Sequence, residues 1–229
     1  MSNLATALVE AARTHPQRPA MRVGCGVLPL VELDELSARV AGGLHAHGLR
    51  PGDRVGLPAP DEPVFPVLYF GALRAGAVAV VAPRRDGVPR AVRPRGAAQG
   101  ARLVFRTTAP ETPHGGVAGT EHTEADDTTV VGVGPGFLDQ MVFWPQRPSV
   151  VHRAGDDVAV VLRSRVGGAD TVLTHDALRA RTRSAARPLH EVPVVSAAAD
   201  VLYATVRTGA CLFGGMVGAA AVPEAGTAG

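Results

Sequence analysis

The stretch RVGLPAPDEPVFPVLYFGALRAGAVAVVA, residues 54–82, decides the fold class. It opens with a short apolar segment, Arg54–Leu57, and closes with a longer one, Ala77–Ala82. Between them, apolar residues in 63–75 recur on one broad face of a helix. Strand, helix and strand in this order predict a βαβ unit, and a right-handed crossover would place the two strands parallel in one sheet. The closing run, apolar at every position, is typical of a strand covered on both faces.

Further elements are predicted on both sides of this unit. Asn3 can cap a first helix that ends at Pro16, and apolar residues recurring every three or four positions from Leu33 to Leu44 predict a helix closed by Gly48. Apolar runs and turn residues predict the rest: a hairpin at 20–23 and 27–30, strands at 101–105 and 158–162, a strand and turn at 130–137, helices at 174–187 and 197–209, and loops at 83–100 and 107–129. The predicted fold class is α/β, with a layered, mostly parallel sheet and flanking helices.

The composition bounds the chemistry. Apolar residues make up 46% and charged residues 19% of the 229 residues, which is typical of a globular protein with a stable core. All 23 basic residues are arginine, because the sequence contains no lysine. Schiff-base chemistry, a lysine general base and a lysine-dependent phosphate loop are therefore excluded for these residues. The net charge of +2 does not by itself favour a nucleic-acid partner.

Targeting signals are not recognisable in the sequence. Residues 1–16 lack the basic start, apolar run and cleavage site of a signal peptide. The apolar stretch 208–223 is short and rich in glycine and alanine, so we expect no membrane span. Cys25 and Cys211 match no metal or redox spacing, and we expect reduced, buried thiols. The predicted location is cytoplasmic.

Two polar regions are candidate binding sites. Seven arginines gather between Arg84 and Arg106 without interleaved aromatic residues, which favours a solvated loop over a nucleic-acid-binding face. The segment HTEADD, residues 122–127, offers oxygen and nitrogen ligands in no metal-binding spacing, which favours an exposed loop. We therefore expect no nucleic-acid partner and no metal site.

The stretch DDVAVVLRSRVGGADTVLTH, residues 156–175, has the outline of a strand, a glycine-containing turn and a helix start. Nucleotide-dependent enzymes often hold phosphate in this arrangement, because backbone N–H groups at the start of a helix face the anion. The residues leave two interpretations open, a phosphate loop and a structural strand-to-helix turn. Arg163 or Arg165 is a candidate replacement for the missing lysine, whereas Asp170 would repel a phosphate group.

Four stretches resemble, in sequence and in order, the N-terminal part of the adenylate-forming enzymes: acyl-CoA synthetases, nonribosomal peptide adenylation domains and luciferases. They are NLATALVEAARTHPQRPAMRV, LPLVELDELSARVAGGLHAHGLRPGDRVGL, PVFPVLYFGALRAGAVAVVAP and DDVAVVL with TVLTHDAL. The resemblance is strongest over residues 3–83 and 156–213, and residues 84–153 diverge and are loop-rich. It implies that residues 1–229 form a single, truncated AMP-binding-like domain, equivalent to the N-terminal portion of the family's large domain.

The resemblance also implies where a site would lie. Ser164, Gly167, Gly168 and Thr174 match positions of the family's phosphate loop, and His190 matches a histidine beside the acyl and pantetheine pocket. The family's loop lysine, proline and hydroxyl run have no counterparts here. The later motifs that contact adenine, ribose and metal, and the catalytic lysine, do not occur in these residues. ATP, Mg²⁺ and CoA are the cofactors that the family uses, but we assign none of them, and no catalytic residue, to this chain.

Three functional hypotheses follow from the absence of these family motifs. In the first, the protein is a catalytically defective acyl-CoA synthetase-like pseudoenzyme that acts through a partner. In the second, it is an acyl- or CoA-binding module with a pocket near His190. In the third, it is an ATP-dependent carboxylate-activating ligase, of the acid–thiol class, completed by another chain. Truncation would leave apolar faces uncovered, so we expect self-association, a protein partner or weak solubility.

Overall fold

The structure, a computed structural model, describes residues 3–23, 26–58, 64–81, 100–107, 120–123, 128–134, 136–163 and 170–184. Its helices are α1 (Ala5–Thr14), α2 (Leu30–Ala46), α3 (Phe65–Arg74), α5 (Phe137–Gln140), the short 3-10 helix η1 (Met141–Phe143) and α6 (His175–Ser184). Its strands are β1 (Pro19–Val23), β2 (Gly26–Pro29), β3 (Arg54–Leu57), β4 (Val78–Val81), β5 (Ala101–Thr107), β6 (Thr120–Thr123), β7 (Thr128–Val133), β8 (Val158–Leu162) and β9 (Thr171–Thr174).

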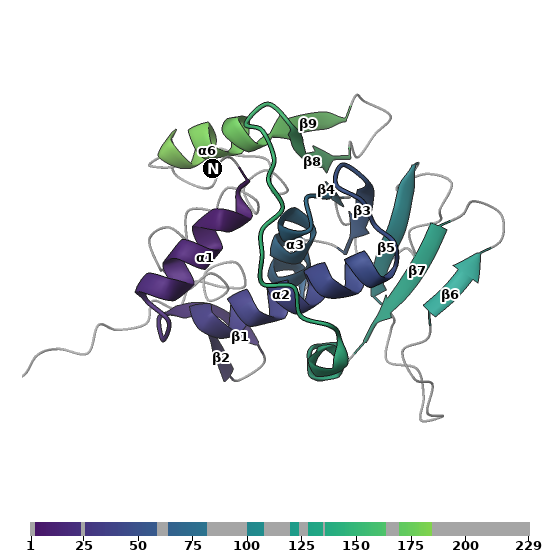
Figure 1. The fold of residues 1–229 in the computed structure, drawn as a ribbon, viewed down its shortest axis with the longest axis horizontal. Coiled ribbons are helices and arrows are strands. Elements are labelled where there is room, and N and C mark those ends of the chain that lie inside the picture. Colours follow the sequence, from purple (N-terminus) through teal and green to yellow (C-terminus); the bar gives the residue numbers. More distant parts are fainter. Residues whose placement is uncertain are drawn as a thin grey trace, which may run out of the picture.

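A seven-stranded sheet with the strand order β6-β7-β5-β3-β4-β8-β9 runs through the molecule (Figure 1). The inner strands β7, β5, β3, β4 and β8 are mutually parallel, and the edge strands β6 and β9 are antiparallel to their neighbours. The strands β1 and β2 form a separate antiparallel hairpin, as predicted. The predicted α/β class, with a mostly parallel sheet and flanking helices, is confirmed.

The predicted βαβ unit is confirmed as β3, α3 and β4. The two strands pair in parallel along their whole length, and every residue of α3 and β4 is buried. Alternate residues of β4 face different apolar clusters: Ala79 and Val81 join the large core, whereas Val78 and Val80 pack with Val161. The uninterrupted apolar run therefore has the expected cause, which is burial of both faces of the strand.

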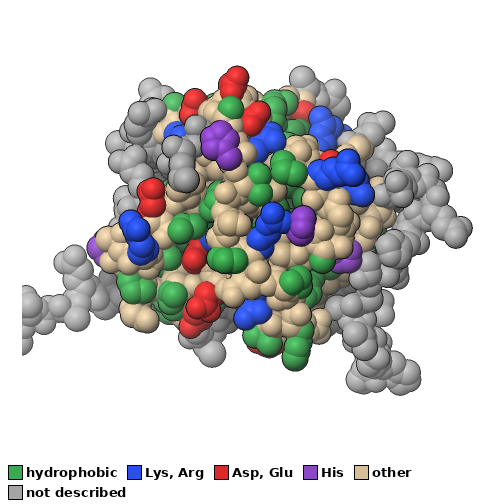
Figure 2. All heavy atoms as spheres, in the orientation of Figure 1, with side chains coloured by type: hydrophobic (Ala, Val, Ile, Leu, Met, Phe, Trp, Pro, Cys, Tyr) green, Lys and Arg blue, Asp and Glu red, His purple; other side chains and the backbone are tan. Residues whose placement is uncertain are grey.

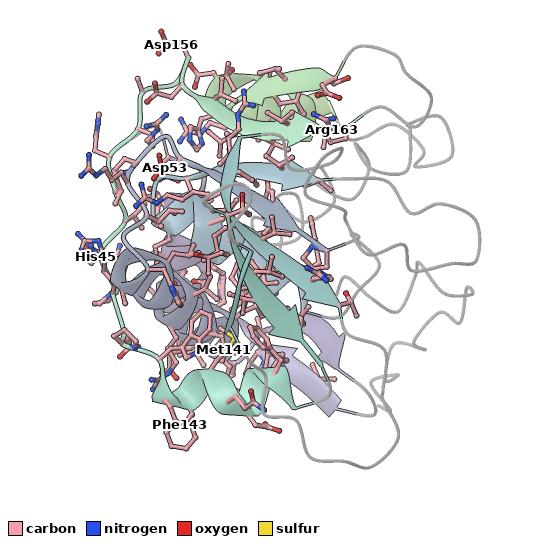
Figure 3. All side chains as sticks on the ribbon, turned by 90° about the vertical axis from the view of Figure 1, so that its right-hand side faces the viewer. His45, Asp53, Met141, Phe143, Asp156 and Arg163 are labelled. Atoms are coloured by element: carbon pink, nitrogen blue, oxygen red, sulfur yellow. The ribbon has the colours of Figure 1, made fainter. Side chains whose placement is uncertain are left out.

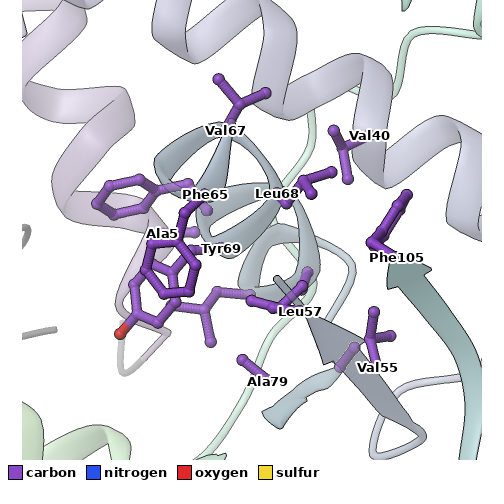
Figure 4. Close-up of a cluster of buried hydrophobic side chains, with 14 of the residues drawn as sticks. Ala5, Val40, Val55, Leu57, Phe65, Val67, Leu68, Tyr69, Ala79 and Phe105 are labelled. Carbon is purple, nitrogen blue, oxygen red and sulfur yellow. The ribbon is translucent and has the colours of Figure 1, made fainter. Parts of the chain in front are cut away.

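The helices α1, α2 and α3 cover one face of the sheet, and the main core lies between them and the strands (Figures 1 and 3). Side chains of α3 extend toward Val40 of α2 and Phe105 of β5 in this core (Figure 4). Phe65 and Tyr69 stack with ring centroids 5.7 Å apart, and Phe70 meets Tyr69 edge-on at 5.4 Å. All three of these aromatic residues are buried, so they belong to the core.

The close packing of α2 on α3 depends on Gly71. A β-carbon built at Gly71 would lie 2.3 Å from Cβ of Val40 and 3.1 Å from the carbonyl oxygen of Ser37. We expect Gly71→Ala to lower the free energy of unfolding by about 1–3 kcal/mol, as overpacking of a core does. Urea denaturation would measure this loss. The double variant Gly71→Ala/Val40→Gly removes the Cβ of residue 40 that a β-carbon at residue 71 would overlap, so it is expected to lose less than the sum of the two single variants, and strict additivity would contradict the packing argument.

The segment 144–157, called the strap below, crosses α2 and α3 on its way from η1 to β8 (Figure 1). The indole ring of Trp144 lies where a β-carbon on Gly43 of α2 would be, only 2.1 Å from that position. The ring also stacks on Phe105 and meets Phe137 edge-on, with centroid distances of 6.4 and 5.8 Å. Further along, the N–H of Arg147 donates to the carbonyl of Ala38 at 2.9 Å. Packing and backbone hydrogen bonds together hold the strap on the helices.

Arg74, at the end of α3, anchors the middle of the strap. Its side chain is 1% exposed; Nη1 donates to the carbonyl of Pro148 at 2.7 Å, and Nη2 forms an ion pair with Asp34 of α2. Its own carbonyl accepts the N–H of Val151 at 2.9 Å. Burial raises the pKa of Asp34 and lowers the pKa of Arg74, in each case against the opposing effect of the partner's charge. One buried arginine thus connects α2, α3 and the strap.

Two predictions about the chain between the main elements were wrong. The segment 107–129 was expected to be a polar surface loop, but Thr120–Thr123 forms the edge strand β6, paired antiparallel with β7. The turn between β8 and α6 was expected to lead straight into the helix, but Thr171–Thr174 first forms β9. β6 is polar and β9 has only two apolar residues among its four, so neither carries a clear strand pattern, and pairing with a neighbouring strand decides both. The predicted loop at 83–99 and the elements predicted after residue 184 lie outside the described residues.

Candidate functional site

The topology of the sheet points to one edge as a ligand site. The strands β3, β4 and β8 are parallel, so their carboxyl ends, at Leu57, Val81 and Leu162, lie at the same edge. The strand that follows β4 along the chain is β5, which lies on the other side of β3 in the sheet, so the direction of strand placement reverses at the β3–β4 pair. Ligands of open α/β sheets bind outside the carboxyl ends of the strands at such a reversal.

An ion pair lies at this edge, at the end of β8. The N–H of Arg163 donates to the carbonyl of Val81 at 2.9 Å, which extends the pairing of β8 with β4 by one residue. The side-chain Nη1 of Arg163 lies 2.9 Å from Oδ2 of Asp170, the residue that precedes β9. The two side chains are 26% and 30% exposed. Asp156 precedes β8 and Arg163 follows it, and Figure 3 shows the two residues at opposite ends of this strand.

The ion pair between Arg163 and Asp170 changes the role that the sequence suggested for each residue. The sequence offered Arg163 as a replacement for the missing lysine and Asp170 as a source of repulsion. The structure brings them together, so the positive charge at this edge is met by the chain's own carboxylate. A charge-assisted bond between a guanidinium and a carboxylate uses the same donors that would bind phosphate. Arg165, the other candidate, lies outside the described residues.

The remaining predicted site residues are mostly outside the part of the chain that the structure describes. Ser164, Gly167, Gly168 and His190 all fall there. Thr174 is described, and its Oγ1 accepts the N–H of Ala177 at 3.1 Å. Thr174 therefore caps α6, as a residue with a short hydroxyl side chain does at the start of a helix.

His175, which follows Thr174, is a packing residue. Its side chain is 1% exposed, and its Nδ1 accepts the N–H of Leu4 at 3.2 Å, which assigns the remaining ring proton of the neutral imidazole to Nε2. Burial lowers the pKa of His175 to about 4, and the positive charges of Arg153 and Arg179 add to the effect. The carboxylates of Asp157 and Asp176 oppose the shift but do not reverse it. A histidine that is neutral and enclosed in this way joins α6 to the start of α1.

Asn3 completes this junction, which sequence reasoning found only in part. Its Oδ1 accepts the N–H of Ala5 at 3.0 Å, in agreement with the predicted capping role. Its Nδ2 also donates to the carbonyls of Leu73 and Val151 at 2.7 and 2.8 Å. One amide thus ties α1 to the end of α3 and to the strap. Nothing in the local sequence signals these two bonds, because both acceptors are distant backbone carbonyls.

Charged side chains are intermixed on the surface. On the face seen in Figure 2, basic, acidic and histidine side chains alternate and do not gather by sign. Arg102, part of the arginine-rich region, lies 3.9 Å from Asp53, and most of that region lies outside the described residues. Over the described ranges, no three His, Cys, Asp or Glu side chains converge as metal ligands. No helix in those ranges has the length and apolar content to cross a bilayer.

Comparison with protein families gives one match over most of the chain. A family model described as "AMP-binding enzyme" matches residues 8–162. Salicyl-AMP ligase / salicyl-S-ArCP synthetase of Mycobacterium tuberculosis is 45% identical over 83 residues, which are 34% of this chain and 15% of that protein. Feruloyl-CoA synthase of Amycolatopsis is 43% identical over 81 residues, which are 35% of this chain and 16% of that protein. The matched part thus covers only about a sixth of these relatives.

Solved structures share the fold over nearly the whole chain. A fatty acyl CoA synthetase of Mycobacterium tuberculosis superposes with a TM-score of 0.65 at 20% identity, covering 90% of this chain and 43% of that one. NpsA-ThdA, a fused adenylation–PCP di-domain from Klebsiella oxytoca, superposes with a TM-score of 0.66 at 20% identity, covering 91% and 38%. At this level of identity the likeness concerns the fold alone.

Proposed function

The chain belongs to the AMP-binding enzyme family, and we propose that it is an acyl-CoA synthetase-like pseudoenzyme that does not itself activate carboxylates with ATP. The observation that carries the proposal is the Arg163–Asp170 ion pair, at 2.9 Å, where the sheet edge would receive phosphate. The finding is local to the β8–β9 hairpin, so it does not depend on which other segments a related enzyme would have.

Electrostatics supports the proposal. Adenylation requires a site that holds a triphosphate of several negative charges and stabilises the charge that develops during transfer. Here Arg163 and Asp170 form an ion pair, so the pair itself adds no net positive charge to the edge. At a separation of about 4 Å and an effective dielectric constant of about 20, a carboxylate repels one phosphate charge by roughly 4 kcal/mol. No lysine is present to compensate, since the sequence contains none.

The direct test is carboxylate-dependent exchange of pyrophosphate into ATP. With aryl and fatty carboxylates as substrates, we expect no exchange above the rate without carboxylate. A parallel thermal denaturation series with ATP, AMP, CoA and an acyl-CoA would show whether any of them stabilises the fold, because a ligand that binds the native state raises the melting temperature. Exchange above background would overturn the proposal.

A graft separates the contribution of the hairpin from that of the rest of the chain. In an active enzyme of the family, the phosphate loop is replaced by the eight residues RSRVGGAD, 163–170 of this chain. We expect exchange to fall by about a hundredfold or more, the size of effect that follows loss of preorganised charge stabilisation. The matched control grafts the same residues with aspartate replaced by glycine and an added lysine. Full activity of the first graft would contradict the proposal.

A further inference from the structure

Among the described residues, Phe143 of η1 is the most exposed large apolar side chain, at 86%. We propose that Phe143 anchors a symmetric contact between two copies of this chain, in which a face formed by α2 and η1 packs on the same face of the second copy. The inference goes beyond the proposed function, because it does not depend on whether the chain acts on ATP.

Phe143 belongs to a group of exposed apolar residues. Val142, its neighbour in η1, is 56% exposed, and Pro145 at the start of the strap is also exposed. Figure 3 shows the ring of Phe143 pointing away from the body of the molecule. A single exposed apolar residue is ordinary, whereas several together that include an aromatic ring are typical of a contact site. These three residues, with Glu35 and Arg39 of α2, are called the α2–η1 face below.

The backbone that carries Phe143 is held in place from both sides. Met141, at the start of η1, is fully buried, and the N–H of Trp144 donates to its carbonyl at 3.0 Å. From α2, Nη1 of Arg39 donates to the carbonyls of Val142 and Trp144 at 2.7 and 3.2 Å. Phe143 is therefore exposed on a fixed turn of the chain. Contact with a partner would immobilise little more than its ring, so the loss of conformational entropy on binding is small.

The charges beside the apolar residues make the α2–η1 face complementary to itself. Glu35, which is exposed, and Arg39 lie one turn apart on α2 and so on the same side of the helix. Arg39 uses Nη1 for its bonds to η1, and within the described part of the chain Nη2 and Nε remain as donors for a carboxylate. Figure 2 shows acidic, basic and hydrophobic side chains next to one another in this part of the surface. Across a two-fold axis, Glu35 of each copy would meet Arg39 of the other.

These features favour a second copy as the occupant of the α2–η1 face. A partner surface of one sign would bring a like charge to either Glu35 or Arg39, and like charges oppose binding. A two-fold contact pairs both residues and places the two apolar groups against each other, where an aromatic ring buries about 150–250 Å². A face centred on so few residues is smaller than a standard interface of about 20–30 residues a side. We therefore expect a weak, reversible dimer.

The test is sedimentation velocity of the full chain over about a thousandfold range of concentration, which covers dissociation constants in the micromolar range. We expect an equilibrium between monomer and dimer, and Phe143→Ser should raise the dissociation constant at least about tenfold, as loss of a central aromatic anchor does. The matched control is Val172→Ser on β9, which is 55% exposed and should dimerise as the unmodified protein does. Both variants should keep the melting temperature of the unmodified protein, because the substituted side chains are exposed.

Charge reversal tests the two-fold arrangement. Glu35→Arg would place an arginine opposite Arg39 at both symmetric positions, and we expect it to raise the dissociation constant about three- to tenfold at low salt. Glu10→Arg, the same change at an exposed position on α1, should leave the dissociation constant unchanged.

The inference is wrong if the unmodified chain stays monomeric at every concentration or associates beyond the dimer without a defined end. It is also wrong if either Phe143→Ser or Glu35→Arg leaves the dimer as strong as before. A dimer weakened by Val172→Ser would assign the contact to the edge strand β9 instead. None of these results bears on the proposed function, which fails only if the chain catalyses carboxylate-dependent exchange.

Discussion

Replacement of Arg74 by methionine is expected to lower the free energy of unfolding by about 3–5 kcal/mol, the usual cost of removing one partner of a buried ion pair. The change leaves the carboxylate of Asp34 without its cation and the carbonyl of Pro148 without its donor. Urea denaturation would measure the loss, with the fluorescence of Trp144 as the probe. Trp144 is the single tryptophan and lies at the start of the strap.

Two further variants separate charge from packing in this prediction. Arg18→Met, at an exposed position, should change the stability by less than about 0.5 kcal/mol. Arg74→Met/Asp34→Leu removes both charges and should recover part of the lost stability, because an apolar pair can replace a buried ion pair at little cost. If the double variant is as unstable as Arg74→Met, the arginine stabilises the fold through its packing and its bond to the strap, and the charge argument is wrong.

Acidification is expected to destabilise the protein through His175. Its pKa is about 4 in the folded chain and about 6.5 when exposed in the unfolded chain. Between these values the unfolded state binds more protons, so the free energy of unfolding falls as the pH decreases from about 6.5 to about 4. The contribution of His175 is fully present above pH 6.5, and its loss amounts to about 3 kcal/mol at pH 4 and below. Denaturant titrations at half-unit pH steps would measure the slope.

The control for this prediction is His175→Asn, because the amide oxygen can take the place of Nδ1 and accept the N–H of Leu4 without titrating. This variant should show a much flatter dependence of stability on pH across the window. His152→Asn, at an exposed position, should keep the slope of the unmodified protein. An unchanged slope in His175→Asn would assign the acid sensitivity to another group.

Most of the regular structure could be predicted because its signals are local. The apolar runs of β4 and β8 and the recurring apolar face of α2 are properties of consecutive residues, and each produced an element close to the predicted bounds. The parallel pairing of β3 with β4 followed from the handedness of the crossover. The missed strands β6 and β9 are short and rich in threonine, and they exist because a neighbouring strand satisfies their backbone groups.

The candidate site was only half predictable for the same reason. The order of apolar run, glycine turn and Thr174 located the strand β8 and the cap of α6, because these features lie next to one another in the chain, but it did not locate β9. That Arg163 is paired with Asp170, seven residues later, depends on how β9 folds back on β8. The buried roles of Arg74, His175 and Asn3 were missed or incomplete, since their partners are 40 to 171 residues away.

The sequence by itself therefore determined the α/β class, the βαβ unit and the absence of lysine from these residues. Each is a matter of which residues are present and in what local order. Only the tertiary structure decided that the charge of Arg163 is met by Asp170, that His175 is buried and that Arg74 joins the strap to the helices. The physical reason is that the energy of a charge or a polar group depends on its burial and its partner, and both are set by residues distant in the chain.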